Sequence, residues 1–169
     1  MEFRLATMSD LEQLKSVYKE IIENMNNNQI QIWDEIYPCE FFEEDIKNSQ
    51  LYVMIENDEI VSAFALCNSN SGEDAVKWKE CNASALYIDR LGVNVKYLRK
   101  GIGNLMLEKA EKVAKSKGAS YLRLFVVDIN KPAISLYEKN GFVKASGIYD
   151  EVIDDDLILH EFGYELAIR

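Results

Sequence analysis

The stretch Leu98-Arg99-Lys100-Gly101-Ile102-Gly103-Asn104 decides the fold, because it stands where a β-strand pattern changes into a helix pattern. Residues 85–95 before it are apolar and β-branched at alternate positions, and the apolar spacing after it is helical as far as Lys117-Gly118. Glycines at the start of a helix let a phosphate group reach unpaired backbone N–H groups at the positive end of the helix dipole. Residues 99–117 carry six Lys or Arg against two Glu, in a chain of net charge −10. We therefore expect a polyanionic ligand here, with an ordinary solvated helix as the alternative.

Two familiar phosphate-binding motifs do not fit this stretch. The Walker P-loop, G-x-x-x-x-G-K-[ST], has no match in the sequence. The dinucleotide motif G-x-G-x-x-G is half present, but Met106 replaces its third glycine. The turn also follows several earlier strands rather than opening the first β-α-β unit, so both kinds of nucleotide site are disfavoured.

A second segment follows the apolar run 121–127 and reads N-K-P-A-I-S-L-Y-E-K-N-G-F over residues 130–142. Asn130 is a good helix cap, Pro132 suits the first turn of a helix, and Gly141 stands just past its end. Seven residues, or two helical turns, separate Asn130 from Tyr137, so both fall on one face of this short helix.

Together the two segments resemble the GNAT superfamily, the acyl-CoA-dependent N-acetyltransferases. That family has a strand, the motif Q/R-x-x-G-x-G/A, a helix, a buried strand, an Asn and a Tyr around the next helix, and a Gly-Phe strand start. The corresponding residues are Leu91-Gly92-Val93, Leu98 to Gly103, Leu124 to Val127, Asn130, Tyr137 and Gly141-Phe142. The likeness is close over residues 85–149, and the Q/R position of the motif holds Leu98.

The resemblance implies that acetyl-CoA is the co-substrate. Backbone groups of Leu91, Gly92 and Val93 would pair with the pantetheine arm as an added strand does, and the N–H near Val93 would face the thioester oxygen. Asn130 would also contact the pantetheine. The pyrophosphate would lie on the backbone of Arg99, Lys100, Gly101, Ile102, Gly103 and Asn104.

The resemblance also assigns proton transfers. Tyr137 would protonate the leaving thiolate, because a phenol of pKa about 10 can give a proton to a thiolate whose thiol has a pKa of about 8.5. From spacing alone, a core aromatic is the simpler interpretation of Tyr137. For the general base we choose Asp89, which shares strand parity with Leu91 and Val93. His160 and Glu161 are further candidates, and an ordinary salt bridge of Asp89 is the alternative.

The amine acceptor must be recognised largely by the first half of the chain. Trp33 and Tyr37 would line a cleft in which Asp34 and Glu35 attract a cation, and Tyr87 faces the same side as Asp89. Plain core packing is an equal alternative for Trp33. The acidic stretch 150–156 is interpreted as a loop that either borders this cleft or is simply solvated.

Composition narrows the class of protein. With 169 residues, 48% apolar and 28% charged, the chain fits one domain over residues 1–169. We expect a cytoplasmic protein, since there is no long apolar run and no signal-peptide pattern. The expected oligomeric state is a monomer or a homodimer. A net charge of −10 argues against nucleic-acid partners and favours amines. Three cysteines and one histidine offer no zinc pattern, so no metal is expected, although a Cys/His nucleophilic pair stays open.

The expected fold is an α/β (α+β) single domain with a central mixed, mostly antiparallel sheet of about seven strands and helices on both faces. Strands are expected at 2–6, 51–56, 60–67, 85–95, 121–127, 142–148 and 157–168, and helices from about residue 10 to 25, at 40–47, at 101–117 and from 131 to 140. The expected function is acetyl transfer from acetyl-CoA to a primary amine of a small molecule, polyamine or peptide, by direct attack in a ternary complex. A non-catalytic acyl-CoA-binding regulatory module is the alternative.

Overall fold

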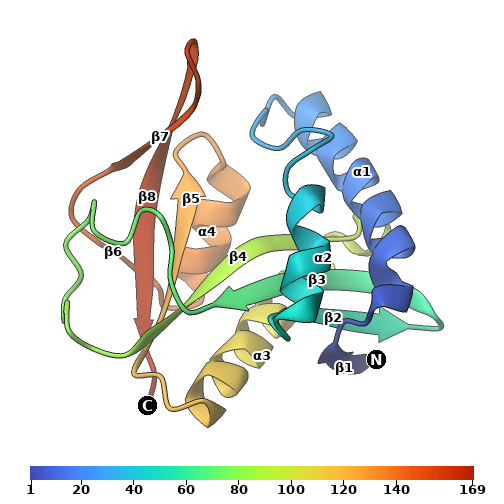
Figure 1. The fold of residues 1–169 in the computed structure, drawn as a ribbon, viewed down its shortest axis with the longest axis horizontal. Coiled ribbons are helices and arrows are strands. Elements are labelled where there is room, and N and C mark those ends of the chain that lie inside the picture. The colour runs from blue at the N-terminus through green and yellow to red at the C-terminus, as the bar shows by residue number, and fades with distance from the viewer. The chain divides into compact units, whose positions relative to one another are not determined.

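The computed structural model describes residues 1–169 and contains four α-helices and eight β-strands (Figure 1). The hydrogen-bonded strand order is β1-β2-β3-β4-β5-β8-β6, with β7 paired to β8. The β4–β5 pair is parallel, and the pairs β1–β2, β2–β3, β5–β8, β6–β8 and β7–β8 are antiparallel. The expected mixed, mostly antiparallel α/β sheet is therefore confirmed, with eight strands.

Two compact units divide the chain, one of Met1–Leu66 with Arg90–Met106 and the other of Cys67–Asp89 with Leu107–Arg169. The first unit holds β1 (Glu2–Leu5), α1 (Leu11–Asn27), α2 (Phe42–Lys47), β2 (Leu51–Glu56) and β3 (Glu59–Cys67). Strand β4 (Ala85–Val93) and helix α3 (Ile102–Ser116) belong partly to each unit. The second holds β5 (Tyr121–Val127), α4 (Lys131–Lys139), β6 (Val143–Lys144), β7 (Tyr149–Asp154) and β8 (Leu157–Ala167). The single domain over residues 1–169 stays a prediction.

In the first unit, α1 and α2 cover the same face of β2 and β3 (Figure 1). Helix α1 buries the apolar positions that its spacing predicts, among them Leu14, Tyr18 and Ile21. Its entry is fixed by Asp10, which accepts a hydrogen bond from the backbone N–H of Thr7 at 2.7 Å. The β2–β3 hairpin turns at Asn57 and Asp58, whose φ values of 50° and 63° are the left-handed geometry of a tight two-residue turn.

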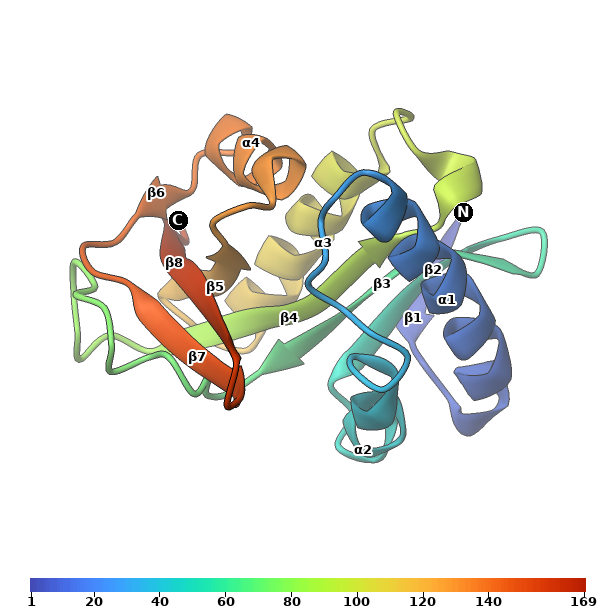
Figure 2. The same ribbon diagram turned by 90° about the horizontal axis from the view of Figure 1, so that it is seen from above.

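In the second unit, α3 and α4 lie on the same side of β5 (Figure 2). Strand β5 is buried along almost its whole length, as its continuous apolar sequence predicts for a central strand. Its parallel register with β4 begins at Ala85–Tyr121 and ends at Ile88–Leu124. None of the helices combines the length and apolar character needed to cross a bilayer.

The C-terminal region departs from the prediction. The stretch 150–156 is not an acidic loop, because most of it forms β7, which pairs with β8. The strand expected over 142–148 is reduced to Val143–Lys144. Four of the six β7 side chains are exposed, among them Asp150 and Asp154, while the backbone pairs with β8. Strand β4 also ends at Val93 rather than Val95, because the Asn94 side chain accepts a hydrogen bond from the N–H of Lys96 and starts a 3₁₀ turn.

Candidate functional site

The last residues of β4 are oriented by side chains of the first unit. The Tyr18 hydroxyl of α1 donates to the carbonyl oxygen of Arg90 at 2.6 Å, and the Ser62 hydroxyl of β3 donates to that of Gly92 at 2.6 Å. In a planar trans peptide the C=O of one residue and the N–H of the next point in opposite directions. The N–H of Leu91 therefore points away from Tyr18, and that of Val93 points away from Ser62. This direction suits a donor to a ligand, which is the role predicted for Val93.

Gly92 is required by close packing. A Cβ atom at this position would lie 2.9 Å from both Cε2 and Cζ of the Tyr18 ring and 3.0 Å from Cδ1 of Ile21. Those separations are too short for any side chain, and the Tyr18 ring is held between the rings of Trp33 and Phe42. The family resemblance implies a ligand contact for the backbone of Gly92, but nothing in the sequence indicates this neighbour on α1.

The predicted phosphate loop, residues 98–104, has an open backbone. Arg99 and Gly101 adopt left-handed φ values of 62° and 76°, and nothing lies within 4 Å of the place a Cβ would take at Gly101. Arg99, Lys100 and Leu98 are exposed, and the Lys100 ammonium lies 5.2 Å from the centroid of the Tyr97 ring. Helix α3 begins directly afterwards at Ile102. An anion can thus approach the helix N-terminus here, and the residues present fit a pyrophosphate.

Tyr137 and Asn130 lie on or beside α4, as expected. The Asn130 side-chain oxygen accepts from the N–H of Ala133 at 3.4 Å and caps the helix. Tyr137 is 8% exposed and packs against the rings of Phe142 and Tyr164, which the core-aromatic interpretation also predicts. Its hydroxyl, however, has no hydrogen-bond partner in the chain, although buried tyrosines usually find one. Burial and, to a lesser degree, the charge of Asp89 raise the pKa of this phenol, so it keeps its proton at physiological pH.

Asp89 is held by the loop that follows β3. Its Oδ1 accepts a hydrogen bond from the Asn70 amide at 3.2 Å. The Asn70 side-chain oxygen in turn accepts from the N–H of Gly72 at 2.8 Å, which leaves the amide nitrogen to face Asp89. The contact at Asp89 Oδ1 is thus with a neutral amide. Sequence reasoning missed Asn70, because it lies 19 positions away in a polar loop.

The two other candidate bases differ from Asp89. Burial, together with the Glu151 carboxyl, raises the pKa of Glu161 to about 9, so Glu161 is protonated at neutral pH and cannot accept a proton there. The His160 Nδ1 lies 2.6 Å from the Asp150 carboxylate, and this hydrogen bond raises the pKa of the imidazole. Both side chains of that pair are more than half exposed. The choice of Asp89 as general base stays a prediction.

A cavity of about 910 Å³ in the first unit borders the predicted acceptor residues. It runs between one side of α1 and the segment 33–43, and Trp33, Asp34 and Glu35 contribute to its wall. Trp33 also stacks on Tyr18 with 5.8 Å between ring centroids, so it both lines the cavity and packs on the core. Tyr37 is not part of this wall, because its ring packs edge-on against Phe41 at 5.4 Å.

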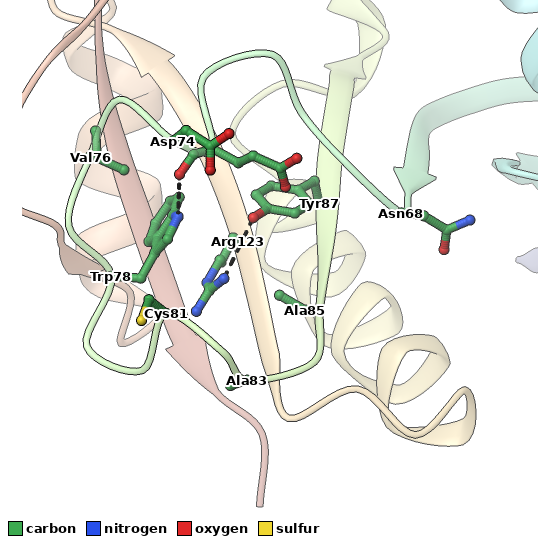
Figure 3. Close-up of a pocket in the computed structure, with 10 residues that line it drawn as sticks. Asn68, Asp74, Val76, Trp78, Cys81, Ala83, Ala85, Tyr87 and Arg123 are labelled. Atoms are coloured by element: carbon green, nitrogen blue, oxygen red, sulfur yellow. Dashed lines mark hydrogen bonds between the residues drawn. The ribbon is translucent and has the colours of Figure 1, made fainter.

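Tyr87 lines a different cavity, of about 380 Å³, in the second unit (Figure 3). Figure 3 shows Arg123 from β5 between Tyr87 and Trp78. The Arg123 guanidinium lies 4.6 Å from the Trp78 ring centroid, donates to the carbonyl oxygen of Glu80 at 2.9 Å and approaches Glu165 at 3.5 Å. These contacts explain the one charge in the apolar sequence of β5. Tyr87 is itself only 3% exposed, so it forms the floor of this cavity.

Comparisons with known proteins identify the family of the chain. The model of the acetyltransferase (GNAT) family matches residues 14–142. Bacillus subtilis (strain 168) YwnH, provisionally named a phosphinothricin acetyltransferase, is 26% identical over 148 residues, which are 85% of each chain. Thialysine N-epsilon-acetyltransferase of Bos taurus is 41% identical over 64 residues, 38% of this chain and 36% of that protein. The structure of a GNAT-family acetyltransferase from Streptococcus agalactiae 2603 has a TM-score of 0.80, with 19% identity and coverage of 99% and 95% of the two chains. The chain therefore belongs to the acetyltransferase (GNAT) family and is an acyltransferase.

Proposed function

We propose that this enzyme transfers the acetyl group of acetyl-CoA to a primary amine of a small molecule, polyamine or peptide by direct attack in a ternary complex. The observation that carries the proposal is Tyr137, a buried phenol that keeps its proton and whose hydroxyl has no partner in the chain. A phenol that is still protonated when the thiolate leaves has a proton to give it. The names of the relatives, which concern phosphinothricin and thialysine, support an amine acceptor.

In the first unit, backbone groups bind three parts of acetyl-CoA. The open turn at Gly101 and the N-terminus of α3 bind the pyrophosphate, with Arg99 and Lys100 adding positive charge. The N–H of Val93 donates to the thioester oxygen, which gains negative charge as the amine attacks. Leu91 and Gly92 hold the pantetheine arm by backbone hydrogen bonds, as an added strand would.

In the second unit, the proposal assigns the proton transfers. The Asp89 carboxylate accepts a proton from the acceptor ammonium, directly or through water, and the neutral amine then forms the new C–N bond. As the C–S bond breaks, the Tyr137 hydroxyl gives its proton to the thiolate sulfur. The nitrogen loses its second proton as the amide forms, which restores the Tyr137 hydroxyl directly or through water, and Asp89 releases its proton to solvent. The products are an N-acetyl amine and CoA thiol. Asn130 caps α4 and keeps its amide nitrogen for the pantetheine.

The acceptor is proposed to be a cation before it loses its proton. Asp34 and Glu35 stand on the wall of the cavity in the first unit, beside the indole of Trp33. Carboxylates and an aromatic face are the groups that attract an ammonium ion. The net charge of −10 acts in the same direction over longer distances.

The experiment that tests this proposal is the replacement Tyr137→Phe. The ring and most of its packing remain, and only the hydroxyl is lost. We expect kcat to fall by about 10²–10⁴-fold, while acetyl-CoA affinity barely changes, because the interaction belongs to the transition state. Tyr52→Phe is the matched control. Tyr52 of β2 is also 8% exposed, and its ring packs between those of Phe3 and Phe64. Near-normal kcat for Tyr137→Phe, measured where chemistry limits the rate, would make Tyr137 a structural residue.

A further inference from the structure

An unusual backbone conformation interrupts β4 immediately before the segment that the proposed function uses. Arg90 adopts a φ of 58°, in the left-handed region that residues with a Cβ rarely occupy. No glycine stands at this position, so the surrounding structure must hold the conformation. The residues that follow are Leu91, Gly92 and Val93.

The side chain of Arg90 is fixed by a buried carboxylate on α2. The Arg90 Nε donates to Asp45 Oδ2 at 2.8 Å and Nη2 donates to Oδ1 at 2.7 Å, which is the paired geometry that guanidinium and carboxylate groups favour. Both side chains are less than 10% exposed. The guanidinium also lies 5.0 Å from the ring centroid of Phe41. Contacts from two directions thus hold Arg90, because the Tyr18 hydroxyl binds its carbonyl oxygen as well.

Stability alone does not account for this ion pair. Burial, with a smaller contribution from Glu44, raises the pKa of Asp45 even though Arg90 lowers it, which shows that the carboxylate is costly to bury. Buried pairs of this kind contribute little net stability, and in some proteins their role is instead to select one geometry among several. The geometry selected here is that of the peptide between Arg90 and Leu91.

We propose that Asp45 is a positioning residue for acetyl transfer: through Arg90 it holds the left-handed turn of β4 and so aims the backbone N–H groups of Leu91 and Val93. The inference rests on the proposed function, in which those groups bind the thioester and the pantetheine. Asp45 touches no substrate in this account. Its effect on the reaction passes entirely through the backbone of β4.

The first experiment replaces Asp45 by Asn, which keeps the shape of the side chain and removes its charge. We expect kcat to fall by about 10- to 100-fold, because a small misplacement of an oxyanion donor is costly, while the KM for acetyl-CoA changes much less. The matched control is Asp10→Asn. Asp10 forms the same paired contact with Arg4, at 2.8 and 3.0 Å, and is 8% exposed, but it binds the start of α1 rather than β4. Asp10→Asn is expected to lower thermal stability and leave kcat unchanged.

A second pair of variants separates the backbone from the ion pair. Asp45→Asn combined with Arg90→Ala, and Asp45→Asn combined with Arg90→Gly, both lack the charges and differ only by one Cβ. Glycine adopts a φ near 58° without strain, so the glycine variant is expected to recover about tenfold in kcat over the alanine variant. These two variants also keep the test usable if Asp45→Asn does not fold, since neither leaves an unpaired buried arginine.

The outcomes distinguish this inference from the proposed function. If the unaltered enzyme shows no amine-dependent release of CoA thiol, the proposed function fails. If the unaltered enzyme is active but folded Asp45→Asn has a near-normal kcat, the positioning role of Asp45 is overturned. Equal kcat values for the alanine and glycine variants would overturn it as well.

Discussion

The first prediction concerns the phosphate loop, and its control is a second glycine at the other end of α3. Gly101, just before α3, has a φ of 76° and open space where a Cβ would stand. Gly118, beyond the other end of α3, has a φ of 82° and the same open space. Replacing either glycine by Val forces a side chain into the left-handed region, which costs roughly 1–2 kcal/mol of stability. The two variants should therefore lose stability to a similar extent.

Only Gly101→Val is expected to affect the co-substrate. Its side chain would occupy the space through which phosphate oxygens reach the N–H groups at the start of α3. CoA affinity should fall by about tenfold to a thousandfold, or roughly 1.4–4 kcal/mol, whereas Gly118→Val should bind CoA normally. Titration calorimetry measures the affinity, and thermal unfolding by circular dichroism confirms that both variants fold. Unchanged affinity in folded Gly101→Val would remove this loop from the binding site.

Three other predictions concern packing, pH and charge. Gly92→Ala brings a Cβ to 2.9 Å from the Tyr18 ring, so thermal unfolding should show a loss of about 1–3 kcal/mol and kcat should fall with it; a normal kcat would contradict the account of β4. The carboxyl of Glu161 has a pKa of about 9 in the folded state against 4.5 in water, so between these values the folded state binds a proton that the unfolded state has lost. The free energy of unfolding therefore falls as pH rises from 5 to 9, by at most about 1.4 kcal/mol per pH unit. Urea unfolding of Glu161→Gln should lack this decline. Cationic acceptors should be preferred, and their KM should rise with salt at saturating acetyl-CoA; a preference for anionic acceptors would refute this.

Local patterns in the sequence predicted most of the elements and part of the site. The spacing of Leu14, Tyr18 and Ile21 gives α1, and the polar pair at 57–58 gives the hairpin turn, because each depends on residues close in the chain. The same is true of the cap at Asn130 and of the open turn at Gly101. For these features the local preference and the final structure coincide.

The remainder depends on contacts between distant positions. Asp45 meets Arg90 across 45 positions, and nothing near either residue indicates its partner. The Tyr18 ring that excludes a side chain at Gly92 lies on α1, far from β4 in the sequence. Strand β7 was missed because its acidic sequence is typical of a loop, and only pairing with β8 makes it a strand. Tertiary packing overrides local preference at each of these places.

Acetyl transfer itself is measured by the release of CoA thiol from acetyl-CoA, for the unaltered enzyme with a panel of amines. We expect at least one cationic primary amine to raise the rate in a saturable manner, and mass spectrometry to find one acetyl group added to that amine for each thiol released. Binding of acetyl-CoA without any amine-dependent release above the hydrolysis background would contradict this expectation, and would leave a CoA-binding module that does not catalyse transfer.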